Sequence, residues 1–113
     1  MGYFVNTVES YRIRYFGASS MGPADLKAWL YLYGPGHKTG LVGTIGFYAP
    51  EALASKQDHL DGLGRPRGHM DINEITGVMD MLRHERPIHV HWSEQWQQLL
   101  LDTEKEPVGE QEP

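Results

Sequence analysis

The sequence contains no cysteine and no long hydrophobic run. The lack of cysteine excludes a disulfide framework, a zinc–thiolate site and a thiol nucleophile. No apolar stretch approaches the roughly 18 residues that a membrane span needs, so we expect no membrane contact. The first residues have no basic region and reach Glu9 early, which argues against a secretory signal. We therefore expect a cytoplasmic protein.

Complete catalytic and cofactor motifs are also missing. The serines have no nucleophile-elbow or oxyanion signature around them, so no Ser-His-Asp triad is predicted. In segment 34–39, His37 stands where a phosphate-binding loop requires glycine before Lys38. A strand-like segment follows this loop instead of a helix, and we interpret it as a hairpin turn. These features favour a non-catalytic protein without a cofactor.

Charge is distributed unevenly along the chain. The net charge is −5, and the residues from Asp102 onward contain five acids and one base. The preceding residues are close to neutral, with ten acids against nine bases. We expect one domain over residues 1–102, followed by an acidic, disordered tail over residues 103–113.

Several segments alternate apolar residues with polar or aromatic ones, as half-buried strands do. The expected strands lie at about 8–16, 26–33, 41–48, 69–72, 88–92 and 96–101. Inside segment 41–48, Gly43 and Gly46 indicate a bulge or the close approach of a neighbour. Residues 50–56 suggest one or two helical turns, and the rest of segment 50–68 reads as an irregular loop.

One amphipathic helix is predicted over roughly residues 73–85. Its apolar stripe consists of Ile75, Val78, Met79 and Leu82. Either Asp71, three residues before Glu74, or Asn73 provides the N-terminal cap, and Pro87 prevents continuation. The fold class is therefore α+β, a mainly antiparallel sheet of five to six strands in the order β-β-β-loop/β-α-β-β, with the helix on the aliphatic face.

Alternation predicts a sheet with two different faces, because successive strand side chains point to opposite sides. The aliphatic side contains Ile13, Leu30, Leu32, Ile88 and Val90, and the other side contains Arg12, Arg14, Trp29, Tyr31, Tyr33, His89 and His91. Arginine and aromatic residues are typical of buried interface centres, which favours a homodimer. A curled sheet with these aromatics in its core is a second interpretation.

The aromatic–arginine residues Arg12, Arg14, Trp29, Tyr31 and Tyr33 are the main candidate binding residues. The candidate ligands are a peptide, a small molecule and nucleic acid. Aromatic side chains on a sheet stack the bases of single strands, and arginine contacts phosphates. The alternative function is therefore single-stranded nucleic-acid binding, with the acidic tail as an autoinhibitory competitor.

Two further arginines lie in the glycine-rich segment 62–68. Arg65 and Arg67 are suited to contact a phosphate or a carboxylate. The segment lacks the strand-before, helix-after context of a dinucleotide fingerprint. Its competing interpretation is a mobile, solvated loop.

His89 and His91 are the candidate metal ligands. Histidines two residues apart on a strand project to the same side and are able to share a divalent transition metal. Glu94, His84 and His69 are candidate third ligands, but spacing selects none of them. A metal-dependent enzyme is the third hypothesis, weighed against two half-exposed histidines that bind no metal.

Overall fold

The computed structural model describes residues 3–17, 25–35 and 40–103. These residues form eight strands and two helices in the order β1 (Tyr3–Val8), β2 (Ser10–Tyr15), β3 (Leu26–Tyr33), β4 (Leu41–Tyr48), α1 (Pro50–Leu53), β5 (His59–Leu60), β6 (Pro66–Asp71), α2 (Ile75–His84), β7 (Ile88–Ser93) and β8 (Gln98–Thr103). A 3-10 turn, Ile72–Glu74, leads into α2. The α+β class is confirmed.

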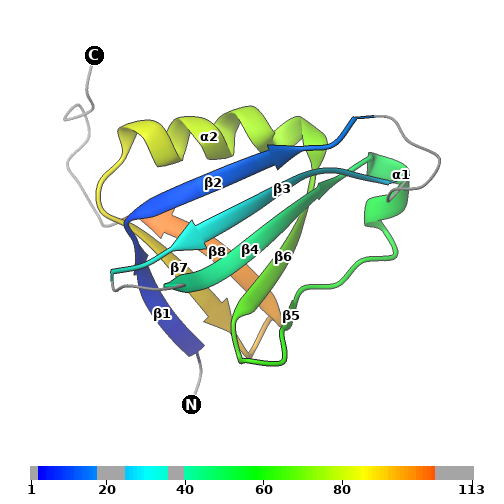
Figure 1. Ribbon diagram of the computed structural model, residues 1–113. Coiled ribbons are helices and arrows are strands. Elements are labelled where there is room, and N and C mark those ends of the chain that lie inside the picture. The colour runs from blue at the N-terminus through cyan, green and yellow to red at the C-terminus, as the bar shows by residue number, and fades with distance from the viewer. Residues whose placement is uncertain (1–2, 18–24, 36–39, 104–113) are drawn as a thin grey trace.

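The strands form two sheets instead of the single sheet that we predicted. The larger sheet has the order β2-β3-β4-β6-β5, and the smaller has the order β1-β7-β8. All pairs are antiparallel except β4 with β6. In Figure 1 the larger sheet lies in front of the smaller one. Alternation indicates which side of a strand is apolar, but not which sheet the strand joins.

Glu9 separates two strands where the sequence predicts one strand over 8–16. Val8, before it, pairs with Ile88 in the smaller sheet, and Ser10, after it, pairs with Tyr33 in the larger one. The backbone N–H of Glu9 donates to the carbonyl of Tyr33 at 2.7 Å. The chain therefore crosses between sheets at a single residue. Strand β1, before this crossing, was missing from the prediction.

Strands β3 and β4 agree with the predicted ranges and pair antiparallel, as the hairpin interpretation of segment 34–39 requires. Residues 36–39 of that connection lie outside the described residues. Residues 50–68 are more ordered than predicted. They contain α1 and β5, and β6 begins at Pro66 instead of near His69.

Helix α2 confirms the predicted amphipathic helix, with different ends. Asp71 caps the preceding 3-10 turn by accepting from the backbone N–H of Asn73 at 2.9 Å, so Asp71 is the cap. Met79 is buried, and Ile75, Val78 and Leu82 pack against the core. The helix ends at His84, before Pro87.

Strands β7 and β8 form the predicted hairpin, but its turn is longer. Trp96, expected in the second strand, lies in the turn over 94–97 and is 62% exposed. Gln97 has a φ of 52°, the left-handed conformation that closes the turn before β8. Strand β8 includes Thr103, the first residue of the expected tail, and residues 104–113 lie outside the described residues.

The core lies between the two sheets and is closed by α2. Its buried members are Ala28, Leu30, Leu32, Ile45, Phe47, Met79, Val90 and Leu99. The predicted aliphatic side thus lines the core, but Ile88 and Val90 do so from the smaller sheet, opposite the others, and not from one shared sheet. Gly68 permits a close approach of the sheets, since an added Cβ would lie 3.2 Å from Leu99 Cβ. The aromatic–arginine residues consequently lie outside the core, and the curled-sheet interpretation is wrong.

Candidate functional site

The candidate site is the outer face of the larger sheet, the side that points away from the core. Register places its residues in two rows across the strands. One row is Arg12, Tyr31, Thr44, Arg67 and His59; the other is Arg14, Trp29, Gly46 and His69. Ser10 and Tyr33 lie at one end of this face, and Tyr48 and Asp71 at the other. Adjacent strands are about 4.8 Å apart, so the rows form a continuous surface.

Arginine side chains lie over the aromatic rings of this face. The guanidinium carbons of Arg12 and Arg14 are 5.9 and 5.6 Å from the ring centre of Tyr31. That of Arg67 is 5.2 Å from the ring centre of Trp29. Trp29 and Tyr31 meet edge to face, with ring centres 6.3 Å apart. The positive charges stabilise the arrangement through the negative ring faces.

Gly46 makes room for two of the rings. A Cβ at this position would lie 2.8 Å from Tyr48 Cε1 and 3.1 Å from Trp29 Cζ3. The rings therefore occupy the space that a side chain would take, which confirms the predicted close approach. The ammonium of Lys56 lies 5.0 Å from the ring centre of Tyr48.

The far end of the face is fixed by Asp58. Its Oδ1 accepts from the backbone N–H of His69 at 2.9 Å and lies 3.1 Å from His69 Nδ1. Its Oδ2 accepts from the backbone N–H of Leu99 at 2.9 Å. The His69 ring lies 5.7 Å from His59 and 5.5 Å from Tyr48, measured between ring centres. Asp58 therefore links β6 of the larger sheet to β8 of the smaller one.

The electrostatics of the face are dominated by cations. Arg12, Arg14, Arg67 and Lys56 contribute four positive charges in a chain whose net charge is −5. Within the described part of the chain, Arg67 Nε is a buried nitrogen without a hydrogen-bond partner. Burial raises the pKa of Tyr48, against the opposing effect of the positive charge of Arg67.

The two loop arginines are separated by the structure. Arg65 pairs with Asp61 at 2.8 Å, inside a turn in which Asp61 also accepts from the backbone N–H groups of Leu63 and Arg65. Burial alone would raise the pKa of Asp61, but these bonds and the Arg65 charge lower it. Arg67 instead belongs to β6 and to the outer face. The interpretation of residues 62–68 as one solvated loop is therefore wrong for Arg67.

His89 and His91 lie on the outer face of the smaller sheet, on the opposite side of the molecule from Trp29 and Tyr31. Their ring centres are 6.3 Å apart and the rings are nearly perpendicular. His89 Nδ1 lies 3.4 Å from Thr7 Oγ1, and His91 Nε2 lies 3.3 Å from Asp102 Oδ2.

No candidate third ligand completes the predicted metal site. In the described ranges, no three His, Asp or Glu side chains are grouped so as to hold a metal ion, and Glu94, His84 and His69 provide no such group. The metal site and the metal-dependent enzyme remain predictions.

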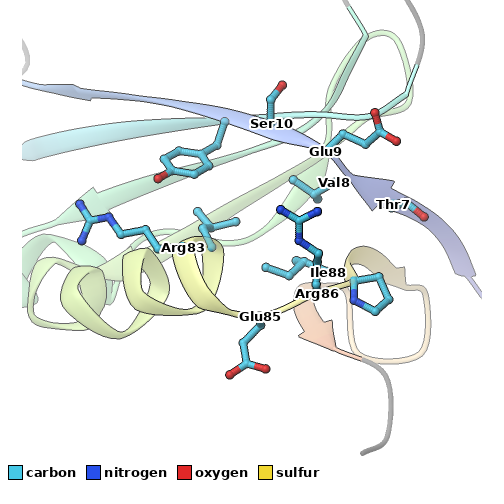
Figure 2. Close-up of a pocket in the computed structure, with 11 residues that line it drawn as sticks. Thr7, Val8, Glu9, Ser10, Arg83, Glu85, Arg86 and Ile88 are labelled. Carbon is cyan, nitrogen blue, oxygen red and sulfur yellow. The ribbon is translucent and has the colours of Figure 1, made fainter. Parts of the chain in front are cut away.

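A pocket of about 830 Å³ lies between the crossing at Glu9 and the end of α2 (Figure 2). Its lining consists of Thr7, Val8, Glu9, Ser10, Tyr11, Leu82, Arg83, Glu85, Arg86, Pro87 and Ile88. In Figure 2, Arg86 extends toward the strands and Glu85 points away from them. The charges in the lining are mixed, so the pocket favours no ligand class as clearly as the outer face does. Sequence reasoning missed it, because it depends on the crossing between sheets.

The residues of the outer face that sequence reasoning missed are Tyr48, Lys56, His59 and His69. Tyr48 was detectable, because Thr44, Gly46 and Tyr48 alternate against the buried Ile45 and Phe47. The positions of His59 and Lys56 depend on the path of segment 54–60 along the β6 edge of the sheet, for which the sequence holds no signal.

The described residues contain no helix that is long and apolar enough to cross a membrane. Comparison of the chain with family models, curated proteins and solved structures finds no match.

Proposed function

We propose that this protein is a non-catalytic binding module whose binding surface is the outer face of the larger sheet. The observation that carries the proposal is the arrangement of arginines over Trp29 and Tyr31 on an exposed sheet face. The segment after α1 runs beside β6 at the edge of the larger sheet (Figure 1), and from it Lys56 reaches the ring of Tyr48. Arg12 and Arg14 are exposed, and Trp29, Tyr31 and Tyr33 are half-buried.

The charge of the face favours an acidic ligand. Four cations surround the rings, and they outnumber the two acids Asp58 and Asp71 at the far end of the face, where Asp58 holds His69 and Leu99 and Asp71 caps the turn before α2. Such a surface attracts anions and repels other cationic surfaces. We therefore propose an acidic partner in a cytoplasmic setting, which the lack of cysteine suits.

The predicted homodimer is the competing occupant. A face-to-face dimer would bring together two copies of a surface with four cations each, and like charges across an interface weaken association. The same charges that favour an acidic ligand thus count against this dimer. Homodimer formation stays a prediction, and the following experiment tests it.

The proposal is tested by following the indole N–H resonance of Trp29 in the full chain. Trp92 lies in the core and Trp96 in a turn of the smaller sheet, so only Trp29 reports on the outer face. The probes are an oligothymidylate and a polyglutamate peptide. A second copy of the protein is tested by dilution, which would separate a homodimer. At least one of these tests is expected to shift the Trp29 signal. If none does, the face is not a binding surface.

The matched variants exchange the same number of charges at two places. Arg12→Glu with Arg14→Glu changes the outer face, whereas Arg83→Glu with Arg86→Glu changes the pocket of Figure 2. We expect only the first pair to abolish the Trp29 shift. Equal loss in both pairs would mean that net charge, and not the outer face, determines binding.

A further inference from the structure

We infer that the ligand of the outer face is single-stranded nucleic acid, an inference that rests on the proposed function. Trp29 and Tyr31 lie two residues apart on the same side of β3, a distance of about 6.7 Å along the strand. Half-exposed rings at this spacing on a sheet form a platform on which successive unpaired bases stack.

The cations lie on both sides of this platform. Arg12 and Arg14 come from β2, on one side of β3, and Arg67 comes from β6, beyond β4 on the other. A single strand presents bases and phosphates together, so rings with flanking cations match both. An acidic peptide would use the arginines but leave the rings without planar partners. A duplex keeps its bases paired and stacked internally.

The arginines contribute more than charge. Each guanidinium that now lies over Tyr31 or Trp29 is a planar group, and such groups stack on bases as well as on aromatic side chains. A base that binds here would therefore stack on a guanidinium or take its place over the ring.

Arg67 provides an independent observation. Its Nε is buried beside the platform and has no acceptor among the described residues. A buried charged donor without an acceptor is unfavourable, so such a group calls for a physical explanation. Because Nε is buried, a phosphate or base oxygen would accept from it only after the Arg67 side chain turns toward the ligand. Because Arg67 lies over Trp29, the same ligand group would be placed next to a stacked base.

The experiment measures binding of a labelled oligothymidylate of about 12 nucleotides to the full chain by fluorescence anisotropy. Comparison ligands are a blunt duplex of the same length and a polyglutamate peptide. We expect the single strand to bind at least about tenfold more tightly than the duplex, because only unpaired bases reach the rings. Affinity should fall as salt rises, since phosphate contacts release counterions.

Two sets of variants separate the roles of rings and cations. Trp29→Ala should weaken binding roughly tenfold and leave the salt dependence unchanged, whereas Trp29→Phe should retain most of the affinity. Arg12→Ala with Arg14→Ala should lower the slope of log K against log salt by about 1.4, since each single-strand phosphate contact contributes about 0.7. Arg83→Ala with Arg86→Ala is the control and should change neither quantity. Thermal unfolding of each variant establishes that it is folded.

The outcomes distinguish this inference from the proposed function. Equal affinity for single strand and duplex, or a Trp29 contribution that disappears with salt, would overturn the inference and leave a surface for polyanions. A Trp29 shift with polyglutamate or with a second copy, but not with oligonucleotides, would likewise overturn only the inference. No binding of any probe would overturn both.

Discussion

At the scale of single residues, the platform of Trp29 and Tyr31 depends on glycine at position 46, because glycine has no side chain. The rings of Trp29 and Tyr48 fill the space where a Cβ would stand. We predict that Gly46→Ala destabilises the protein by about 1–3 kcal/mol, the usual cost of an overpacked position. It should also move the Trp29 indole resonance and leave that of Trp92 in place. Urea unfolding and NMR measure these two effects.

Gly77 provides the opposite case. It lies in α2, and a Cβ there would meet nothing within 4 Å. Gly77→Ala should therefore stabilise the protein by about 0.5–1 kcal/mol, as expected for alanine in a helix interior. If both substitutions destabilised the protein equally, the crowding at Gly46 would not be the cause of its effect.

The ionisation of Tyr48 makes the stability of the protein depend on pH. Burial raises its pKa above the ordinary value of 10.0, so the folded protein keeps the phenol protonated at a pH where the unfolded chain begins to ionise. The resulting stability is fully present below about pH 10 and is lost as pH rises through the raised pKa.

We predict that the wild type loses unfolding free energy relative to Tyr48→Phe when the pH is raised from about 8 to about 11. Urea unfolding at the two pH values measures it. Tyr15→Phe, at a position that is 63% exposed, controls for the loss of a hydroxyl group. A constant difference for Tyr48→Phe would contradict the assigned burial.

At the scale of elements, Asp58 holds the two sheets together at one edge. One carboxylate oxygen accepts from His69 in β6 of the larger sheet, and the other accepts from Leu99 in β8 of the smaller sheet. Asp58→Ala leaves both backbone N–H groups without an acceptor, and we predict a loss of about 1–3 kcal/mol. Amide exchange at Leu99 should accelerate more than exchange in β3. Urea unfolding and hydrogen exchange measure the two effects.

Asp80→Ala is the control for this variant, because Asp80 is exposed on α2. It should change stability by less than about 0.5 kcal/mol. If amide exchange in the Asp58→Ala variant accelerates equally in both sheets, the variant unfolds globally and does not open locally at this edge.

The elements also show what the sequence reveals about this fold. Strands β3, β4 and β7 and helix α2 were predictable, because each has a strong period of its own. The division at Glu9 was not predicted, although the apolar positions change phase there: Val8 is out of step with Tyr11 and Ile13, and the chain changes sheets at that point. Pro66 resembled loop punctuation, although it begins a strand and is buried.

The candidate site was predictable to a similar degree. Arg12, Arg14, Trp29, Tyr31 and Tyr33 follow from alternation within β2 and β3, and their shared face is confirmed. Arg67 belongs to this face only because β4 pairs in parallel with β6. No local sequence pattern predicts this long-range pairing. For the same reason, His89 and His91 were expected on this face and lie on the outer face of the smaller sheet.

At the scale of the whole molecule, the cationic outer face and the acidic C-terminal segment have opposite charges. Residues 104–113 contain four glutamates and one lysine. Their starting point is close to the face: Thr103 pairs with Ile88, Ile88 pairs with Val8, and Ser10 pairs with Tyr33 at the end of the outer face. Ten residues span at most about 33–36 Å when extended, which is enough to reach Arg12 and Arg14.

We therefore predict that removal of residues 104–113 strengthens oligothymidylate binding several-fold at low salt and has little effect at high salt, where charge interactions are screened. Fluorescence anisotropy across a salt series measures the difference. Changing the four glutamates of this segment to glutamine should reproduce the effect of removal, because that variant retains length and loses charge. Stronger binding after truncation alone would indicate steric blocking instead of electrostatic competition. Unchanged affinity in both variants would show that the acidic segment does not compete for the outer face.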